Sequence, residues 1–150
     1  ITMIKLLWID DNLDHDLTEK RMSLYMEDDL DPHFARDATE AFYRLRDEPF
    51  DVVIFDLRLP PGADDMWNDL RKLGFWQYGV ELLKMVSTGL EGTFKNQCNA
   101  RFGVFSIEAP GHDHDIFLNP INLPTSNFMK KTDAYYEEDF INFIRKVAAA

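Results

Sequence analysis

Short, strongly apolar runs recur along this chain and alternate with longer segments of mixed character. Residues 4–9 and 52–57 are each apolar except for one charged position, which is typical of strands buried on both faces. Shorter runs at residues 33–36, 104–107 and 127–129 predict three further strands. Because helix-sized segments separate these strands, the pattern indicates a parallel α/β sheet with helices on both faces.

Helices are predicted in the segments between the strands. Residues 13–26 contain no glycine or proline, and residues 39–47 follow good N-cap residues. Residues 80–86 predict a helix after a glycine. The clearest helix is 134–147, where apolar residues recur at near-helical spacing and Asp133 is the predicted N-cap.

Prolines and glycines predict where the regular elements stop. Asp31–Pro32 predicts a turn before the second strand, and residues 60–62 (PPG) break the chain after the third. Residues 88–101 predict a loop containing a strained turn. Since no internal repeat or linker is recognisable, we expect a single domain over residues 4–147.

Acidic residues follow two of the predicted strands directly. Asp10 and Asp11 end the first strand, Asp56 ends the third, and Ser106 lies at the end of the fourth. In a parallel sheet these strand ends share one edge, where ligands bind. Three carboxylates in one crevice favour a divalent cation, and hard oxygen ligands suit Mg²⁺. The alternative for Asp10 and Asp11 is a helix N-cap, but Asp56 makes the metal site the favoured interpretation.

Composition narrows the class of protein. The 150 residues fit one domain, and a hydrophobic fraction of 45% excludes disorder. A formal net charge of −11 argues against nucleic-acid binding. Cys98 is the single cysteine, which fits a reducing compartment, and no apolar run approaches 18 residues. We therefore expect a cytoplasmic protein that does not enter a membrane.

Three motifs together resemble one known family, the receiver domains of two-component response regulators. They are residues 7–12 (LWIDDN), residues 56–60 (DLRLP) and residues 128–131 (FMKK). The resemblance spans residues 4–147. It implies a doubly wound, flavodoxin-like fold with five parallel strands in the order 2-1-3-4-5.

The resemblance also implies roles for individual residues. Asp56 would accept a phosphoryl group from a sensor histidine kinase or a histidine phosphotransfer protein. Asp11 would bind Mg²⁺ directly and Asp10 through water, and the backbone carbonyl of Arg58 would be a further ligand. Lys131 would pair with the phosphoryl oxygens.

Two further residues would carry the switch in such a domain. Ser106 would close onto the phosphoryl group, and Phe128 would change rotamer with it. A downstream effector protein or output domain would read this change, and the domain could form a homodimer. The resemblance implies a phosphoacceptor with autophosphatase activity at most, rather than an enzyme.

The chain departs from the family pattern at three places. Ile107 replaces a small residue after the switch hydroxyl, and Thr132 replaces the proline that usually follows the lysine. In the family, a glycine that opens the next helix usually follows the proline at the position of Pro60 within a few residues. Here the matching glycine is Gly79, which leaves residues 63–78 as an insertion. Ile107 and Thr132 favour one alternative, a degenerate receiver that binds partners without phosphorylation.

A second alternative is an aspartate-nucleophile phosphatase of the haloacid dehalogenase type. Such enzymes need a second aspartate two residues after the nucleophile, where this chain has Arg58.

Two other groups of residues invite a functional interpretation. Residues 112–115 (HDHD) resemble metal ligands, although a solvated acidic loop is the favoured interpretation. The aromatic residues Trp67, Phe75 and Trp76 are most simply extra core. A sharper hypothesis places them in a lid or partner-docking surface over Asp56.

Overall fold

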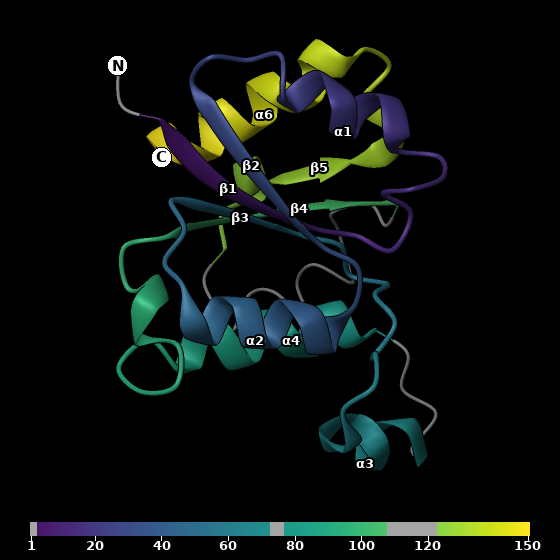
Figure 1. The fold of residues 1–150 in the computed structure, drawn as a ribbon, viewed down its shortest axis with the longest axis vertical. Coiled ribbons are helices and arrows are strands. Elements are labelled where there is room, and N and C mark those ends of the chain that lie inside the picture. The colour runs from purple at the N-terminus through teal and green to yellow at the C-terminus, as the bar shows by residue number, and fades with distance from the viewer. Residues whose placement is uncertain (1–2, 73–76, 108–122) are drawn as a thin grey trace.

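A five-stranded parallel sheet forms the centre of the protein (Figure 1). The computed structural model describes residues 3–72, 77–107 and 123–150. The strand order is β2-β1-β3-β4-β5, so the predicted fold class and strand order are confirmed. The strands are β1 (Ile4–Ile9), β2 (Leu30–Ala35), β3 (Val52–Phe55), β4 (Arg101–Ser106) and β5 (Phe128–Lys130).

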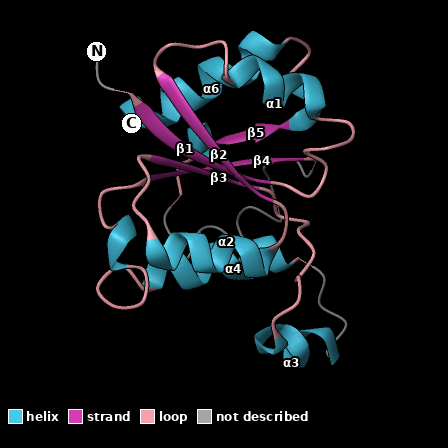
Figure 2. Ribbon diagram, in the orientation of Figure 1, coloured by secondary structure: helices cyan, strands magenta, loops and turns pink. Residues whose placement is uncertain are grey.

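Helices cover both faces of this sheet (Figures 1 and 2). One face carries α1 (Thr18–Leu24) and α6 (Glu137–Ala149), and the other carries α2 (Ala38–Asp47) and α4 (Tyr78–Thr88). The short helix α3 (Asn68–Lys72) projects away from the sheet beyond α2 and α4. Among the described residues, no helix has the length and apolar character needed to cross a membrane.

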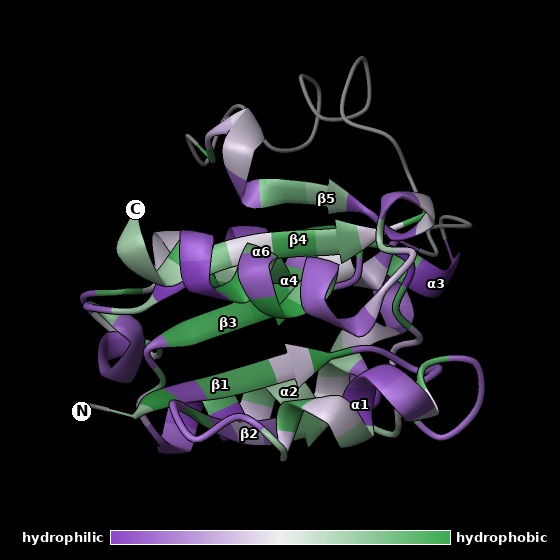
Figure 3. Cartoon of the chain, turned by 90° about the horizontal axis from the view of Figure 1, so that it is seen from above, coloured by the Kyte–Doolittle hydropathy of each residue, from purple (hydrophilic) through white to green (hydrophobic). Residues whose placement is uncertain are grey.

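The sheet separates two apolar layers, and its central strands are largely hydrophobic along their length (Figure 3). On the α1 and α6 side, the ring of Phe140 lies 4.4 Å from that of Trp8 and 4.4 Å from that of Phe105. On the other side, Phe55 and Phe94 are buried with residues of α2 and α4. The apolar composition of β1 and β3 predicts burial on both faces, and the structure has an apolar layer on each side of these strands.

The turn predicted at Asp31–Pro32 is wrong, because both residues belong to β2. Pro32 lies inside β2, opposite Leu6 of β1. A proline has no N–H to donate to a strand ladder, so it is tolerated in an edge strand. Because β2 is the edge of the sheet, Pro32 can turn its missing donor away from β1 without losing a ladder bond.

The helix starts that differ most from prediction are those of α1 and α6. Helix α1 starts only at Thr18, because residues 12–17 form turns in which the Leu13 carbonyl accepts a bond from Arg21 Nε at 3.0 Å. Helix α6 starts at Glu137, and Asp133 is not its N-cap, because Lys131–Asp133 form a 3₁₀ turn first. The predicted strained turn in residues 88–101 is absent, since the positive-φ glycine of the described residues is Gly62.

Trp67 belongs to the core and not to a lid. Its side chain is 1% exposed, and its ring meets that of Tyr78 edge-on at 5.9 Å. Its Nε1 donates to Thr39 Oγ1 of α2 at 3.1 Å. The lid hypothesis is therefore wrong for this residue. Phe75, Trp76 and the predicted loop at residues 112–115 lie outside the described residues.

Gly79 allows α4 to begin directly against the chain that leaves β3. A Cβ atom on this residue would overlap the Asp56 carbonyl oxygen and lie 2.8 Å from the Asp56 carbonyl carbon and 2.9 Å from the Leu57 oxygen. These neighbours are backbone atoms, which cannot rotate away as a side chain can. The position of α4 therefore depends on the absence of a side chain at residue 79.

We expect Gly79→Ala to destabilise the protein by about 1–3 kcal/mol, because an added methyl group forces the Asp56–Leu57 backbone away from α4. Urea unfolding measures the difference. Gly92→Ala is the matched control, since a Cβ there would meet no heavy atom within 4 Å beyond the glycine and its two chain neighbours. Equal destabilisation of the two variants would contradict this account of Gly79.

Candidate metal centre

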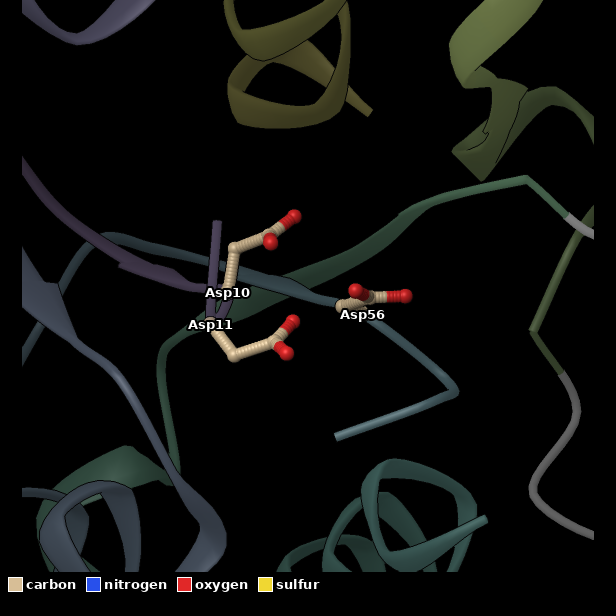
Figure 4. Close-up of side chains that lie close together, drawn as sticks. All are labelled: Asp10, Asp11 and Asp56. Atoms are coloured by element: carbon tan, nitrogen blue, oxygen red, sulfur yellow. The ribbon is translucent and has the colours of Figure 1, made fainter. Parts of the chain in front are cut away.

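Three aspartates converge at the carboxyl edge of the sheet. Asp10 follows β1 and Asp56 follows β3, and these neighbouring strands pair in register through Ile9 and Phe55. One carboxylate oxygen from each of Asp10, Asp11 and Asp56 lies within 4.8 Å of the others. Figure 4 shows the Asp11 carboxylate turned toward Asp56. The predicted convergence at one rim therefore occurs in the structure.

The N-cap alternative for Asp10 and Asp11 is wrong. The N-cap position of α1 is Leu17, several residues beyond the aspartates. Asp10 Oδ1 instead accepts a hydrogen bond from the backbone amide of Asn12 at 2.9 Å. This local bond orients the Asp10 carboxylate at the end of its strand.

Lys131, which follows β5 near the C-terminal end of the chain, places a positive charge beside the aspartates. Its Nζ lies 2.7 Å from Asp10 Oδ2 and 3.2 Å from Asp56 Oδ2. The position of Lys131 follows from β5, which ends at Lys130. Lys131, and not Lys130, is therefore the lysine that faces the acidic cluster, as the family spacing predicts.

Burial changes the protonation of these groups. Asp10 is 0% exposed and Asp56 is 3% exposed, whereas Asp11 is exposed. Burial, and then the neighbouring charge of Asp10, raise the pKa of Asp56 to about 6. Burial also raises the pKa of Asp10, although Lys131 acts in the opposite direction. Burial opposes the charge on Lys131, but the two carboxylates raise its pKa nonetheless.

The donor set fits a hard divalent cation. Three carboxylates face one ammonium group, so Lys131 offsets only part of the negative charge at this edge. Among the described residues, Asp10 Oδ2 has no hydrogen-bond donor of good geometry, and the ion pair with Lys131 is its compensation. Oxygen ligands with excess negative charge are what Mg²⁺ and Ca²⁺ bind.

The backbone that follows Asp56 also contributes to the cluster. The Arg58 amide donates to Asp56 Oδ1 at 3.3 Å. The family resemblance predicts the Arg58 carbonyl as a ligand, but nothing in the sequence indicates its amide as the donor that orients Asp56. Gly79 is predicted only as the start of a helix, and its close approach to Asp56 is not predicted, because neither contact follows from spacing along the chain.

The predicted switch residues lie on the strands next to the cluster. Ser106 is buried at the end of β4 and pairs with Lys130, the neighbour of Lys131. Phe128 is buried at the start of β5, opposite Val104. Ile107 follows Ser106 directly and is 54% exposed. Among the described residues there is no cis peptide bond, so Thr132 follows Lys131 through a trans bond.

Comparison of the fold with solved structures finds a consistent group. A CheY-like response regulator receiver domain protein from Methanospirillum hungatei matches with a TM-score of 0.67 and 16% identity, covering 99% of this chain and 95% of that chain. The non-phosphorylated HemR receiver domain from Leptospira biflexa has a TM-score of 0.64 and 20% identity, covering 98% and 95%.

A third structure is a Burkholderia pseudomallei response regulator with a phosphorylated aspartic acid, a calcium ion and citrate. It matches with a TM-score of 0.62 and 18% identity, covering 97% of this chain and 69% of that chain. No family model and no curated protein sequence matches the chain. The likeness therefore concerns the fold: this chain has the CheY-like fold of response regulator receiver domains.

Proposed function

We propose that this chain is a phosphoacceptor receiver domain in which Asp56 takes a phosphoryl group in a Mg²⁺-dependent way. The observation that carries the proposal is the convergence of Asp10, Asp11 and Lys131 around the buried carboxylate of Asp56. Phosphoryl transfer needs positioning and charge neutralisation more than it needs covalent chemistry from the protein. This cluster can provide both.

The reaction balances with residues of this chain and a phosphohistidine donor. An oxygen of the Asp56 carboxylate bonds to phosphorus while the nitrogen–phosphorus bond of the donor breaks, and the imidazole leaves with its electron pair. The product on this chain is an acyl phosphate. A bound Mg²⁺ would offset negative charge on the phosphoryl oxygens, held by Asp11 directly, by Asp10 through water and by the Arg58 carbonyl.

Lys131 and the buried setting have separate effects on this step. Asp56 attacks only in its ionised form, which burial disfavours. Lys131 favours the ionised form and can follow the negative charge onto the phosphoryl oxygens once the bond has formed. The Burkholderia structure, with its phosphorylated aspartic acid and calcium ion, supports this chemistry on the same fold.

The change would be read at the neighbouring strands. Ser106 and Phe128, on the paired strands β4 and β5, would report phosphorylation to an effector protein, an output domain or a second copy of the chain. A sensor histidine kinase or histidine phosphotransfer protein would be the donor, and a cytoplasmic location fits such partners. Autophosphatase activity would be the only turnover.

A second candidate is a receiver that binds partners without being phosphorylated. It is favoured by Ile107, which places a branched, 54% exposed side chain directly after Ser106 at the edge that carries Asp56. Such a side chain would narrow the approach of donors and water to the carboxylate. A phosphatase is disfavoured, because Arg58 occupies the position of the second aspartate that such enzymes need.

We expect a single phosphoryl adduct when the protein is incubated with acetyl phosphate or phosphoramidate and Mg²⁺. Intact-mass spectrometry measures the adduct, which should disappear in Asp56→Asn and in EDTA. Asp11→Asn should slow its formation on the order of tenfold or more, because a cation ligand is lost. Asp16→Asn, an exposed acid of the same loop, is the control. An unmodified wild type would favour the second candidate.

Truncating Ile107 tests whether its side chain limits access. Ile107→Ala should speed adduct formation from small-molecule donors, and it should speed hydrolysis of the acyl phosphate as well, because both reactions need approach to Asp56. We expect changes of about threefold or more, corresponding to roughly 0.7 kcal/mol in the barrier. Met66→Ala, at another exposed apolar side chain, is the control. Unchanged rates would show that Ile107 does not obstruct the site.

The raised pKa of Asp56 predicts a pH-dependent gain in stability for Asp56→Asn. Between pH 3.8, the ordinary pKa of an aspartate, and about pH 6, Asp56 binds a proton more tightly in the folded protein than in the unfolded chain. Stability from this group is therefore present at low pH and lost as pH rises through about 6. In EDTA at pH 7, Asp56→Asn should raise the free energy of unfolding by about 1 kcal/mol or more.

Urea unfolding between pH 4 and pH 8 measures this difference, which should shrink toward zero at the acidic end. Asp47→Asn is the control, because Asp47 is exposed and its pKa is lowered by Arg46. A difference that stays constant with pH would show that ionisation of Asp56 does not burden the fold.

A further inference from the structure

The chain that leaves Asp56 is held at its far end by the first turn of α2. The Ala38 amide donates to the Pro60 carbonyl at 2.9 Å, and the Thr39 amide donates to the Pro61 carbonyl at 3.0 Å. At the near end, Gly79 of α4 lies against the carbonyls of Asp56 and Leu57. Residues 56–61 therefore run between two helices that contact them at both ends.

The hydroxyl of Thr39 makes more contacts here than a helix side chain needs. It donates to the Pro61 carbonyl at 2.7 Å. It also accepts from the Asp64 amide at 3.2 Å and from Trp67 Nε1 at 3.1 Å. A hydroxyl has one hydrogen and two lone pairs, so all of its hydrogen-bonding capacity is used. Thr39 thus joins α2 to three residues of the chain that follows Asp56, namely Pro61, Asp64 and Trp67.

The turn at Gly62 brings this segment close to the start of α2. Gly62 has a φ of +81°, which favours glycine, and an added Cβ would overlap Asp37 Oδ1. The same Asp37 oxygen caps α2 by accepting from the Glu40 amide at 2.8 Å. The first turn of α2 and residues 60–62 therefore pack together as one unit.

This unit is connected to the acidic cluster through Arg58. The Arg58 amide donates to Asp56 Oδ1 at 3.3 Å, and the Arg58 carbonyl is the ligand proposed above. Leu57 and Leu59, on either side, are 3% and 1% exposed, so the short chain between Asp56 and Pro61 has little room to shift. A displacement at Pro61 would therefore be transmitted to Arg58.

We propose that Thr39 is a positioning residue for the cation site: by holding Pro61, it sets where the Arg58 backbone lies relative to Asp56. The inference rests on the proposed function, since the site it tunes is the Mg²⁺ site. It adds Thr39, whose hydroxyl bonds Pro61, Asp64 and Trp67 rather than a carboxylate of the cluster, to the set that determines cation affinity.

Thr39→Val tests this, because valine matches the shape of threonine and removes the hydroxyl. The Pro61 carbonyl, the Asp64 amide and the buried Trp67 Nε1 would all lose a partner. Isothermal titration with Mg²⁺ should show affinity weaker by about three- to tenfold, less than the effect of losing a group that bonds a ligand directly. Thr39→Ser keeps the hydroxyl and should bind Mg²⁺ within about twofold of the wild type.

Gln97→Met is the matched control, because Gln97 ties down the opposite end of α2. Its Nε2 donates to the Leu45 carbonyl at 2.7 Å and to the Glu48 carbonyl at 2.6 Å. This variant should lower the midpoint of thermal unfolding and leave Mg²⁺ affinity unchanged. Equal affinity in Thr39→Val and the wild type would overturn the role of Thr39 alone, whereas a wild type that binds no Mg²⁺ would overturn the proposed function as well.

Hydrogen exchange keeps the inference testable if Thr39→Val does not fold. Coupling between two sites is reciprocal, so Mg²⁺ should tighten the contacts through which Thr39 acts. In the wild type, Mg²⁺ should slow exchange of the Thr39 amide more than that of the Phe50 amide, which bonds Gln97 Oε1 at the other end of α2. Equal slowing of the two amides would overturn the inference.

Discussion

The buried contact of Lys131 with Asp10 and Asp56 is the interaction on which the site depends. Removing two carboxylates from water costs several kcal/mol for each ion unless a partner of opposite charge is close. Lys131, at 2.7 Å and 3.2 Å from the two carboxylates, offsets part of that cost. With Asp11 beside them, negative charge remains in excess, and this excess makes the edge of the sheet a candidate site for a divalent cation.

The chain after Asp56 must leave this edge without disturbing the carboxylate, and two helices constrain it. Gly79 lets α4 approach the backbone of Asp56 and Leu57 more closely than any other residue would allow. The first turn of α2 holds Pro60 and Pro61 from the other side. The segment that follows is anchored by Trp67, which packs into the core and bonds Thr39. The acidic edge is thus supported by helices that supply none of its charged groups.

Much of this architecture could be predicted because it depends on local composition. Short apolar runs predicted all five strands, and Asp10 and Asp56 could be placed together because parallel strands end at one edge. The predictions that were wrong, for Pro32 and for the start of α6, share one cause: both features depend on how elements distant in the chain pack together. Whether Pro32 breaks a strand depends on whether that strand has a neighbour on its outer side, and where α6 begins depends on the 3₁₀ turn that Lys131 makes to reach the acidic cluster.

The sequence by itself determined the residue types that end each strand, the charge they carry and the alternation of strands and helices. These are properties of single residues and of their periodicity. Only the tertiary structure decided that Asp10 and Asp56 are buried and that Lys131 meets an aspartate 75 residues away. It also decided that Thr39 bonds Pro61, Asp64 and Trp67 on the chain that follows Asp56. Such contacts arise from the packing of elements distant in the chain, so no local pattern encodes the distances on which pKa values and cation binding depend.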